Sequence, residues 1–191
     1  MAQTSTTLSG QKSHQNDLSA TDISFVATGN EYKIKTTSTD LGRFSVRDLI
    51  TVSNSSLNNS TFTVKTVSSA NELIVEEIVT TETSDGSTDT VLTYSGFVTD
   101  KYKGDGYYSQ ADGIHTVAYH VNTTCTGAIK MQGSLATTPT EDDWFDITGT
   151  TFTTDQSTTI SSNNFTGNFV WVRAKCTSNT AGSVTKILYN N

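Results

Sequence analysis

Residues 49–75 read LITVSNSSLNNSTFTVKTVSSANELIV. Three short apolar runs in this stretch, at 49–52, 62–67 and 73–75, alternate with clusters of Ser and Asn. Short strands separated by such turn residues roughly every 8–12 positions are typical of a small β-barrel or β-sandwich. The stretch therefore predicts antiparallel strands joined by short turns.

The alternation inside the middle run predicts which side chains are buried. Successive side chains of a strand point to opposite faces of the sheet, and antiparallel sheets commonly bury only one of them. We therefore expect one buried face and one mostly hydrated face. Phe62, Val64 and Thr66 should lie on one face, and Thr63, Lys65 and Val67 on the other.

The same pattern continues on both sides of this stretch. Ile23, Phe25, Tyr32 and Ile34 precede it, and the apolar run 91–94 follows it. Between the last two runs, residues 80–90 are acidic and rich in Thr, which predicts an exposed loop or hairpin tip. Residues 23–96 are therefore predicted to form a small antiparallel β-barrel or sandwich.

A second antiparallel unit, a β-sandwich, is predicted for residues 113–191. Its expected strands lie at 115–121, 127–135, 144–147, 150–154, 167–176 and 183–188. In the fifth of these, Phe169, Trp171, Arg173 and Lys175 share one face, and Val170, Val172, Ala174 and Cys176 share the other. Such a strand is expected near the middle of a sheet, partly covered on both sides. Residues 97–112, with their Gly and Tyr, are predicted to link the two units.

Residues 1–22 are predicted to form an extended polar arm. They are rich in Gln, Ser, Thr and Asn, and we expect a neighbouring subunit to hold them in place. The candidate assembly contacts are the long apolar side chains of the arm and three linker tyrosines, whose rings suit an interface: Met1, Leu8, Leu18, Tyr102, Tyr107 and Tyr108. A carbohydrate platform is the alternative for the tyrosines.

Composition narrows the fold class to all-β. Thr and Ser together make up about 31% of the chain, which favours strands over helices. Hydrophobic residues make up only 34%, against the roughly 45–50% that is typical when Gly is also counted. The isolated chain is therefore expected to have a thin core and to complete its burial in an assembly.

Charge and hydropathy exclude several partners. The net charge of −7 and the pI of about 4.8 lack the basic footprint of a protein that binds nucleic acid or an anionic membrane. No apolar run approaches the roughly 18 residues of a membrane span, and the first 20 residues show no signal-peptide core. We therefore expect a protein made in a cytosol, with no nucleic acid or membrane partner.

Catalytic and metal motifs are not found in the sequence. His115 and His120 are five positions apart, which puts them on opposite faces of a regular strand, so they cannot share one metal ion. The acidic run 141–143 is interpreted as a solvated loop, and opportunistic Ca²⁺ binding is left open. No nucleophile elbow, phosphate loop or HExxH occurs. We therefore expect no enzyme, no catalytic residues and no cofactor.

Two further residue pairs have alternative interpretations. Cys125 and Cys176 are interpreted as reduced, half-buried thiols, with pairing across two strands as the alternative. Trp144 and Trp171 lie in apolar strands, so core packing is favoured over sugar stacking.

The run from Phe44 to Val67 resembles a small β module that is common in virion proteins of tailed bacteriophages. In that module a Gly-Asp pair precedes a strand reading TVSGS, and NNGTYTV begins the next strand. Here Asp48, Thr51-Val52-Ser53 and Asn58-Asn59 match the pattern, while Arg47, Asn54 and Ser60 stand where the module has glycine.

The C-terminal part looks closer still to structural proteins of marine T4-like phages and related cyanophages. The residues that carry this resemblance lie at 126–139, 144–147, 167–175 and 187–190. It implies a virion structural protein that is assembled in the host cytoplasm. Within that class we favour a capsid decoration or cement protein, whose partners would be other virion proteins, chiefly the major capsid protein, and copies of itself. The alternative is a tail, neck or fibre-associated protein whose C-terminal sandwich binds a cell-surface glycan.

Overall fold

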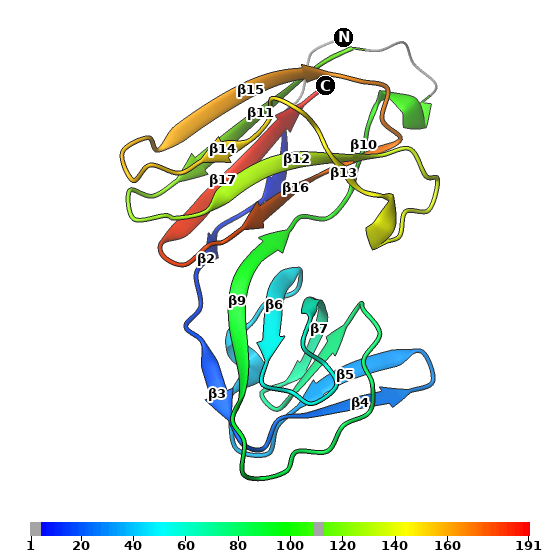
Figure 1. Ribbon diagram of the computed structural model, residues 1–191. Coiled ribbons are helices and arrows are strands. Elements are labelled where there is room, and N and C mark those ends of the chain that lie inside the picture. The colour runs from blue at the N-terminus through cyan, green and yellow to red at the C-terminus, as the bar shows by residue number, and fades with distance from the viewer. Residues whose placement is uncertain (1–4, 109–112) are drawn as a thin grey trace. The chain divides into compact units, whose positions relative to one another are not determined.

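The computed structural model describes residues 5–108 and 113–191, and the fold is all-β with antiparallel strand pairing. The chain divides into two compact units (Figure 1). The N-terminal unit comprises Gln15–Phe97, and the C-terminal unit comprises Met1–His14 together with Val98–Asn191. The all-β prediction is thus confirmed.

The N-terminal unit is one antiparallel sheet with the strand order β9-β6-β7-β8-β5-β4, and β3 pairs with β9. Its elements are β3 (Leu18–Ala20), β4 (Ser24–Thr28), β5 (Glu31–Lys35), the 3₁₀ turn η1 (Leu41–Arg43), β6 (Asp48–Ser53), β7 (Thr61–Ser69), β8 (Glu72–Val75) and β9 (Thr90–Val98). The predicted runs lie in these strands, and Ile23 directly precedes β4. Phe25, Ile34, Phe62 and Leu73 are among the side chains of its shared core.

Strand β7 departs from the predicted alternation after Val64. The β7–β8 ladder is irregular between Val64 and Thr66 and again between Val67 and Ser69. An extra residue in a strand bends it and moves the following side chains to the other face. The expected faces were therefore wrong beyond the first irregularity, because Thr66 is exposed and Val67 packs against the core.

Asp22 fixes the loop that follows β5. Its Oδ2 accepts hydrogen bonds from the side-chain hydroxyls of Thr36, Thr37 and Ser38, at 2.7–2.9 Å. The backbone N–H groups of Thr37 and Ser38 also donate to Oδ2, both at 2.8 Å. These bonds, first of all the one from the Thr37 hydroxyl, hold the pKa of Asp22 well below its ordinary value of 3.8.

We expect Asp22→Ala to lower the free energy of unfolding by about 1–2 kcal/mol at pH 7, because several hydrogen bonds to one carboxylate are lost. The contribution of a carboxylate with a lowered pKa is present above its unfolded pKa and is lost as the pH falls below it. The difference between Asp22→Ala and wild type should therefore shrink below about pH 4. Urea unfolding at several pH values measures it. The control is Asp17→Ala, at an exposed carboxylate; an equal loss there would contradict the prediction.

The C-terminal unit is a β-sandwich. One sheet has the order β1-β17-β11-β15, with β2 also paired to β17 (Figure 1). In the other sheet β12 pairs with β13, β14 and β16, and β10 pairs with β16. The elements are β1 (Thr6–Ser9), β2 (Lys12–Ser13), β10 (Tyr102–Lys103), η2 (Asp105–Tyr108), β11 (Ile114–Val121), β12 (Ala128–Ser134), η3 (Glu141–Asp143), β13 (Phe145–Asp146), β14 (Phe152–Thr153), β15 (Ile160–Thr166), β16 (Trp171–Thr177) and β17 (Ser183–Asn190).

Both sheets turn an apolar face into the core of the sandwich. Every second residue of β11 is buried, among them Val117 and Tyr119. In β16 Val172, Ala174 and Cys176 are fully buried, as the alternation predicted. The Tyr119 hydroxyl donates to the carbonyl oxygen of Thr150 at 2.8 Å, so this buried polar group is satisfied.

The N-terminal segment differs from the predicted arm. Strands β1 and β2 pair with β17, and β3 pairs with β9, so the segment from Thr6 to Ala20 is ordered by strands of its own chain. The expectation that a neighbouring subunit must hold it is therefore corrected.

The predicted linker at 97–112 also differs, because β10 and η2 lie in it and belong to the C-terminal unit.

The two cysteines are buried and unpaired. Burial raises the pKa of Cys176 to about 12 and also raises the pKa of Cys125. Both side chains are therefore neutral thiols at pH 7, in agreement with the predicted reduced state rather than with a cross-strand disulfide, but they are fully buried rather than half-buried.

Candidate interaction surface

Five side chains of the C-terminal unit form an aromatic and cationic patch, which we call the Tyr107 cluster: Lys101, Lys103, Tyr107, Tyr108 and Trp171. The Tyr107 ring lies 5.2 Å from Tyr108 and 5.0 Å from Trp171, between centroids. The Lys103 ammonium lies 4.1 Å from the Tyr107 centroid, and that of Lys101 lies 4.5 Å from Trp171. Tyr107 and Tyr108 are 41% and 54% exposed.

Glycine and strand pairing bring this cluster together. Strand β10 places Lys103 opposite Trp171 of β16. The chain then turns close to the backbone of Phe169, where a Cβ on Gly104 would lie 2.4 Å from the carbonyl oxygen. Only glycine fits there, and it lets the short turn η2 carry Tyr107 against Trp171.

Tyr102 points into the unit rather than outward. Its ring meets that of Tyr189 edge-on at 5.7 Å, and its hydroxyl accepts a hydrogen bond from Thr6 Oγ1 at 3.2 Å. Leu8 lies in the same β1 strand as Thr6 and is half-buried. Tyr102 and Leu8, both predicted as assembly contacts, therefore help to attach β1 to its own unit.

A buried polar triad lies beside this region. His115 is fully buried, and its Nε2 faces two acceptors, the Gly167 carbonyl oxygen at 3.1 Å and Asp105 Oδ2 at 3.4 Å. Nε2 therefore carries the proton, and Nδ1 is free to accept the hydrogen bond from the Tyr189 hydroxyl at 2.7 Å. Burial, with the nearby Asp105 charge, raises the pKa of Tyr189. The triad ties η2, β11 and β17 together.

An open hollow of about 500 Å³ lies at one edge of the sandwich. Phe145 comes from β13 and Phe165 from β15, and the Phe169 ring lies about 6 Å from each. Phe145 is 43% exposed, whereas Phe165 and Phe169 are nearly buried. The hollow thus offers one accessible aromatic face between two edge strands.

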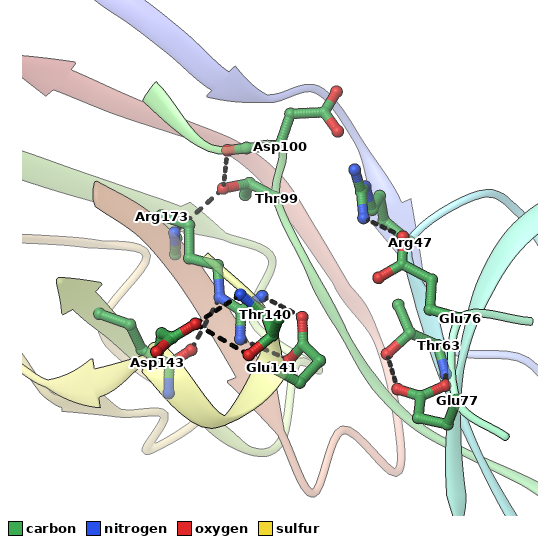
Figure 2. A network of polar contacts seen from close by, with 12 residues as sticks. Arg47, Thr63, Glu76, Glu77, Thr99, Asp100, Thr140, Glu141, Asp143 and Arg173 are labelled. Atoms are coloured by element: carbon green, nitrogen blue, oxygen red, sulfur yellow. Dashed lines mark hydrogen bonds and ion pairs between the residues drawn. The ribbon is translucent and has the colours of Figure 1, made fainter. Parts of the chain in front are cut away.

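The outer side of β16 carries a charged network (Figure 2). Arg173 is only 4% exposed and donates two hydrogen bonds to the Glu141 carboxylate, at 2.7 and 2.8 Å. Its Nε donates to Gln132 Oε1 at 2.9 Å, and its guanidinium lies 4.2 Å from the Trp144 ring centroid. The side chain is therefore held from three directions.

Two polar contacts of the N-terminal unit also appear in Figure 2. The Glu77 carboxylate accepts from the Thr63 hydroxyl at 2.7 Å and from the Thr63 N–H at 2.6 Å. Arg47 pairs with Glu76 at 2.6 Å. The first contact explains how Thr63, predicted to face water, is buried without losing its hydrogen bonds.

The predicted contact residues are not brought together into one site. Tyr107 and Tyr108 lie on the surface, and Leu18 is only 3% exposed in the core of the N-terminal unit, so it is not available as an outer contact. Met1 lies outside the described residues. The two lysines of the cluster were not predicted. Lys101 and Lys103 stand next to Tyr102 and close to Tyr107 in the sequence, and this alternation of Lys and Tyr could have indicated them.

The candidate metal residues are engaged within the fold. His115 and His120 lie on opposite faces of β11, as predicted, with His115 buried. Glu141 pairs with Arg173, and Asp143 accepts from the Thr140 N–H and hydroxyl. Within residues 5–108 and 113–191, no group of three or more His, Cys, Asp or Glu could hold a metal ion.

The Trp side chains are neither fully buried nor free. Both are half-buried, and the Trp171 indole N–H donates to the Thr137 carbonyl oxygen at 3.0 Å. Each ring also faces a cation, Arg173 for Trp144 and Lys101 for Trp171. Core packing therefore accounts only for the buried part of each Trp ring.

Comparison with protein-family models, with curated proteins and with solved structures finds no match to this chain. No helix in the part of the chain that the structure describes is long and apolar enough to span a membrane.

Proposed function

We propose that this chain is a structural protein of a tailed-bacteriophage particle, and within that class a decoration or cement protein of the capsid. The observation that carries the proposal is the backbone at Arg47 and Asn54, where φ is 73° and 61°. Positive φ is uncommon for residues other than glycine, and the phage module has glycine at both positions. Ser60, at the third glycine position, is not among the residues with positive φ.

The geometry around Asp48 also supports the module. Its side chain is 2% exposed, and its Oδ2 accepts a hydrogen bond from the Ser45 N–H at 2.7 Å, which closes the turn before β6. The left-handed Arg47 then directs the chain into the strand, and its N–H donates to the Val64 carbonyl oxygen at 2.7 Å. A Gly-Asp pair at these positions would serve the same turn.

In this role the folded units would bind the assembled shell and stabilise it by mass action, since a protein that binds only the assembled state shifts the equilibrium toward it. Particles that lack the protein are expected to release DNA at a lower temperature than complete particles, and adding the purified protein back should restore the release temperature. Unchanged release would contradict a cementing role. Density for many copies over the shell would support decoration, whereas a single ring at one vertex would indicate a tail or neck protein.

A second candidate, a host-surface glycan-binding module, is favoured by the Tyr107 cluster. Exposed aromatic rings can stack on sugars, and the two lysines would favour acidic sugars. Binding to a panel of acidic polysaccharides tests this candidate with the pair of variants Tyr107→Ala and Tyr108→Ala. Binding that both substitutions weaken would favour the glycan role over decoration. Leu57→Ala, at an exposed side chain of the N-terminal unit, is the control.

A further inference from the structure

Strand β15 is a long edge strand that carries none of the usual protection against pairing. It spans seven residues, Ile160–Thr166, and pairs with β11 along its whole length without a bulge. Within residues 5–108 and 113–191, β11 is the only strand that pairs with it. Natural proteins usually protect such edges with charges, Pro, bulges or short strands, because unpaired backbone groups invite another strand.

The other edges of the same sandwich are protected, which makes β15 an exception. Strands β13 and β14 contain two residues each. Strand β1 contains four, and its ladder with β17 is irregular. By contrast, residues 156–172 around β15 contain no Asp, Glu, Lys, Arg or Pro, although the whole chain carries a net charge of −7.

The register shows which backbone groups of β15 face outward. Val121 N–H donates to the Thr159 carbonyl oxygen at 2.9 Å, and His120 lies opposite Ile160. Opposite residues of an antiparallel ladder alternate between bonded and non-bonded pairs. The backbone groups of the odd-numbered residues of β15 therefore bond to β11. The N–H and C=O groups of the even-numbered residues point to the open edge: Ile160, Ser162, Asn164 and Thr166.

We propose that β15 is the surface through which two copies of this chain pair, antiparallel and about a two-fold axis at Asn163. Such an arrangement places Ser162 opposite Asn164 of the second copy, and Ile160 opposite Thr166 of the second copy. All four outward-facing residues then lie in bonded pairs, each of which exchanges two backbone hydrogen bonds. The two five-stranded sheets become one continuous sheet.

Charge and side chains favour a second copy as the occupant. In the two-fold register each outward N–H and C=O group of β15 meets its complement on the second copy. Because β15 carries no charged side chain, no like charges face each other across the axis. An acidic strand would repel its own copy there. Ser162 and Asn164 supply a donor and an acceptor to each other across the pair, on the same exposed face.

Asn163 adds an independent observation at the axis itself. Its Nδ2 is buried and has no hydrogen-bond partner among the described residues. In the two-fold arrangement the Asn163 side chain of one copy lies beside that of the other, and the amide group has both a donor and an acceptor. Pairing, together with a rotation of the Asn163 side chain toward the axis, would therefore satisfy a group that the single chain leaves unsatisfied. The proposal does not depend on the particle role proposed above.

Sedimentation velocity over a range of protein concentrations tests the proposal, with two double variants that carry opposite charges. Ser162→Lys with Asn164→Lys places like charges opposite each other across the axis, and Ser162→Asp with Asn164→Asp does the same with the opposite sign. We expect wild type to dimerise and each variant alone to remain monomeric, with the dissociation constant raised at least about tenfold. Mixing the two variants should restore a dimer, because Lys then faces Asp.

The control is the double variant Thr151→Lys with Thr153→Lys, which adds the same charge as the Lys variant of β15 but at exposed positions outside that strand. It should dimerise as wild type does. Far-UV circular dichroism confirms that each variant is folded. A wild-type chain that stays monomeric at every concentration overturns the proposal, as does a dimer that persists in both variants. Failure of the mixture to dimerise also overturns it.

Discussion

Glu141→Ala is expected to lower the free energy of unfolding of the C-terminal unit by about 3 kcal/mol, because it leaves the guanidinium of Arg173 buried without its carboxylate. Arg173 is 4% exposed, so water reaches it poorly, and Gln132 supplies only one neutral acceptor. Removing one partner of a buried ion pair costs more than the pair itself contributes, since the remaining charge is uncompensated.

The reciprocal change should cost less. In Arg173→Met the aliphatic stem still packs against Trp144, and Glu141, whose side chain is 35% exposed, can be hydrated. We expect a loss of about 1 kcal/mol for this variant. Both tryptophans, Trp144 and Trp171, belong to the C-terminal unit, so urea unfolding followed by Trp fluorescence reports on this unit. A larger loss for Arg173→Met than for Glu141→Ala would contradict the argument.

The strands predicted from sequence were those with apolar alternation. The runs at 49–52, 62–67 and 73–75 lie in β6, β7 and β8, and the run 115–121 lies in β11. Burial of every second residue is enough to fix such a strand, because any other conformation exposes its apolar face. The error in β7 arose at a bulge, which inserts one residue into the ladder and leaves no signature in the hydrophobic pattern.

Strand β15 was not predicted, and the reason is physical. Its sequence ISSNNFT contains residues that favour turns, and Phe165 is its only buried side chain. Hydrogen bonds to β11, rather than the burial of apolar side chains, hold it in the sheet. The same polar composition that hides the strand in the sequence leaves its outer edge neutral, and the dimer proposal depends on that neutrality.

The short strands at the N-terminus were missed for a related reason. Residues 1–22 look disordered by composition, yet β1 and β3 find partners that lie more than 60 residues away along the chain, in β17 and β9. Pairing at such a distance depends on the tertiary fold. In the Tyr107 cluster, by contrast, Tyr107 and Tyr108 were predicted as contact residues from sequence, and the structure places both on the surface. The contact of Tyr107 with Trp171 was not predicted, because the two residues lie far apart along the chain.

Gly182→Ala is expected to lower the free energy of unfolding of the C-terminal unit by about 3–5 kcal/mol. Gly182 has φ of 71°, where a side chain costs about 1–2 kcal/mol. A Cβ there would also lie 2.3 Å from the backbone nitrogen of Cys125 and 2.5 Å from the carbonyl carbon of Thr124. These are backbone atoms, so the overlap can be relieved only by moving two chain segments apart.

Gly149 provides the matched control, because it isolates the conformational cost. It belongs to the same unit and has φ of 80°, and a Cβ at this position would have open space around it. Gly149→Ala should therefore cost only about 1–2 kcal/mol. Urea unfolding followed by Trp fluorescence measures both variants. If the two substitutions cost the same, close backbone approach at Gly182 is not what requires glycine there. A larger cost at Gly182 would show that the close approach of residues 124–125 to its backbone requires glycine there.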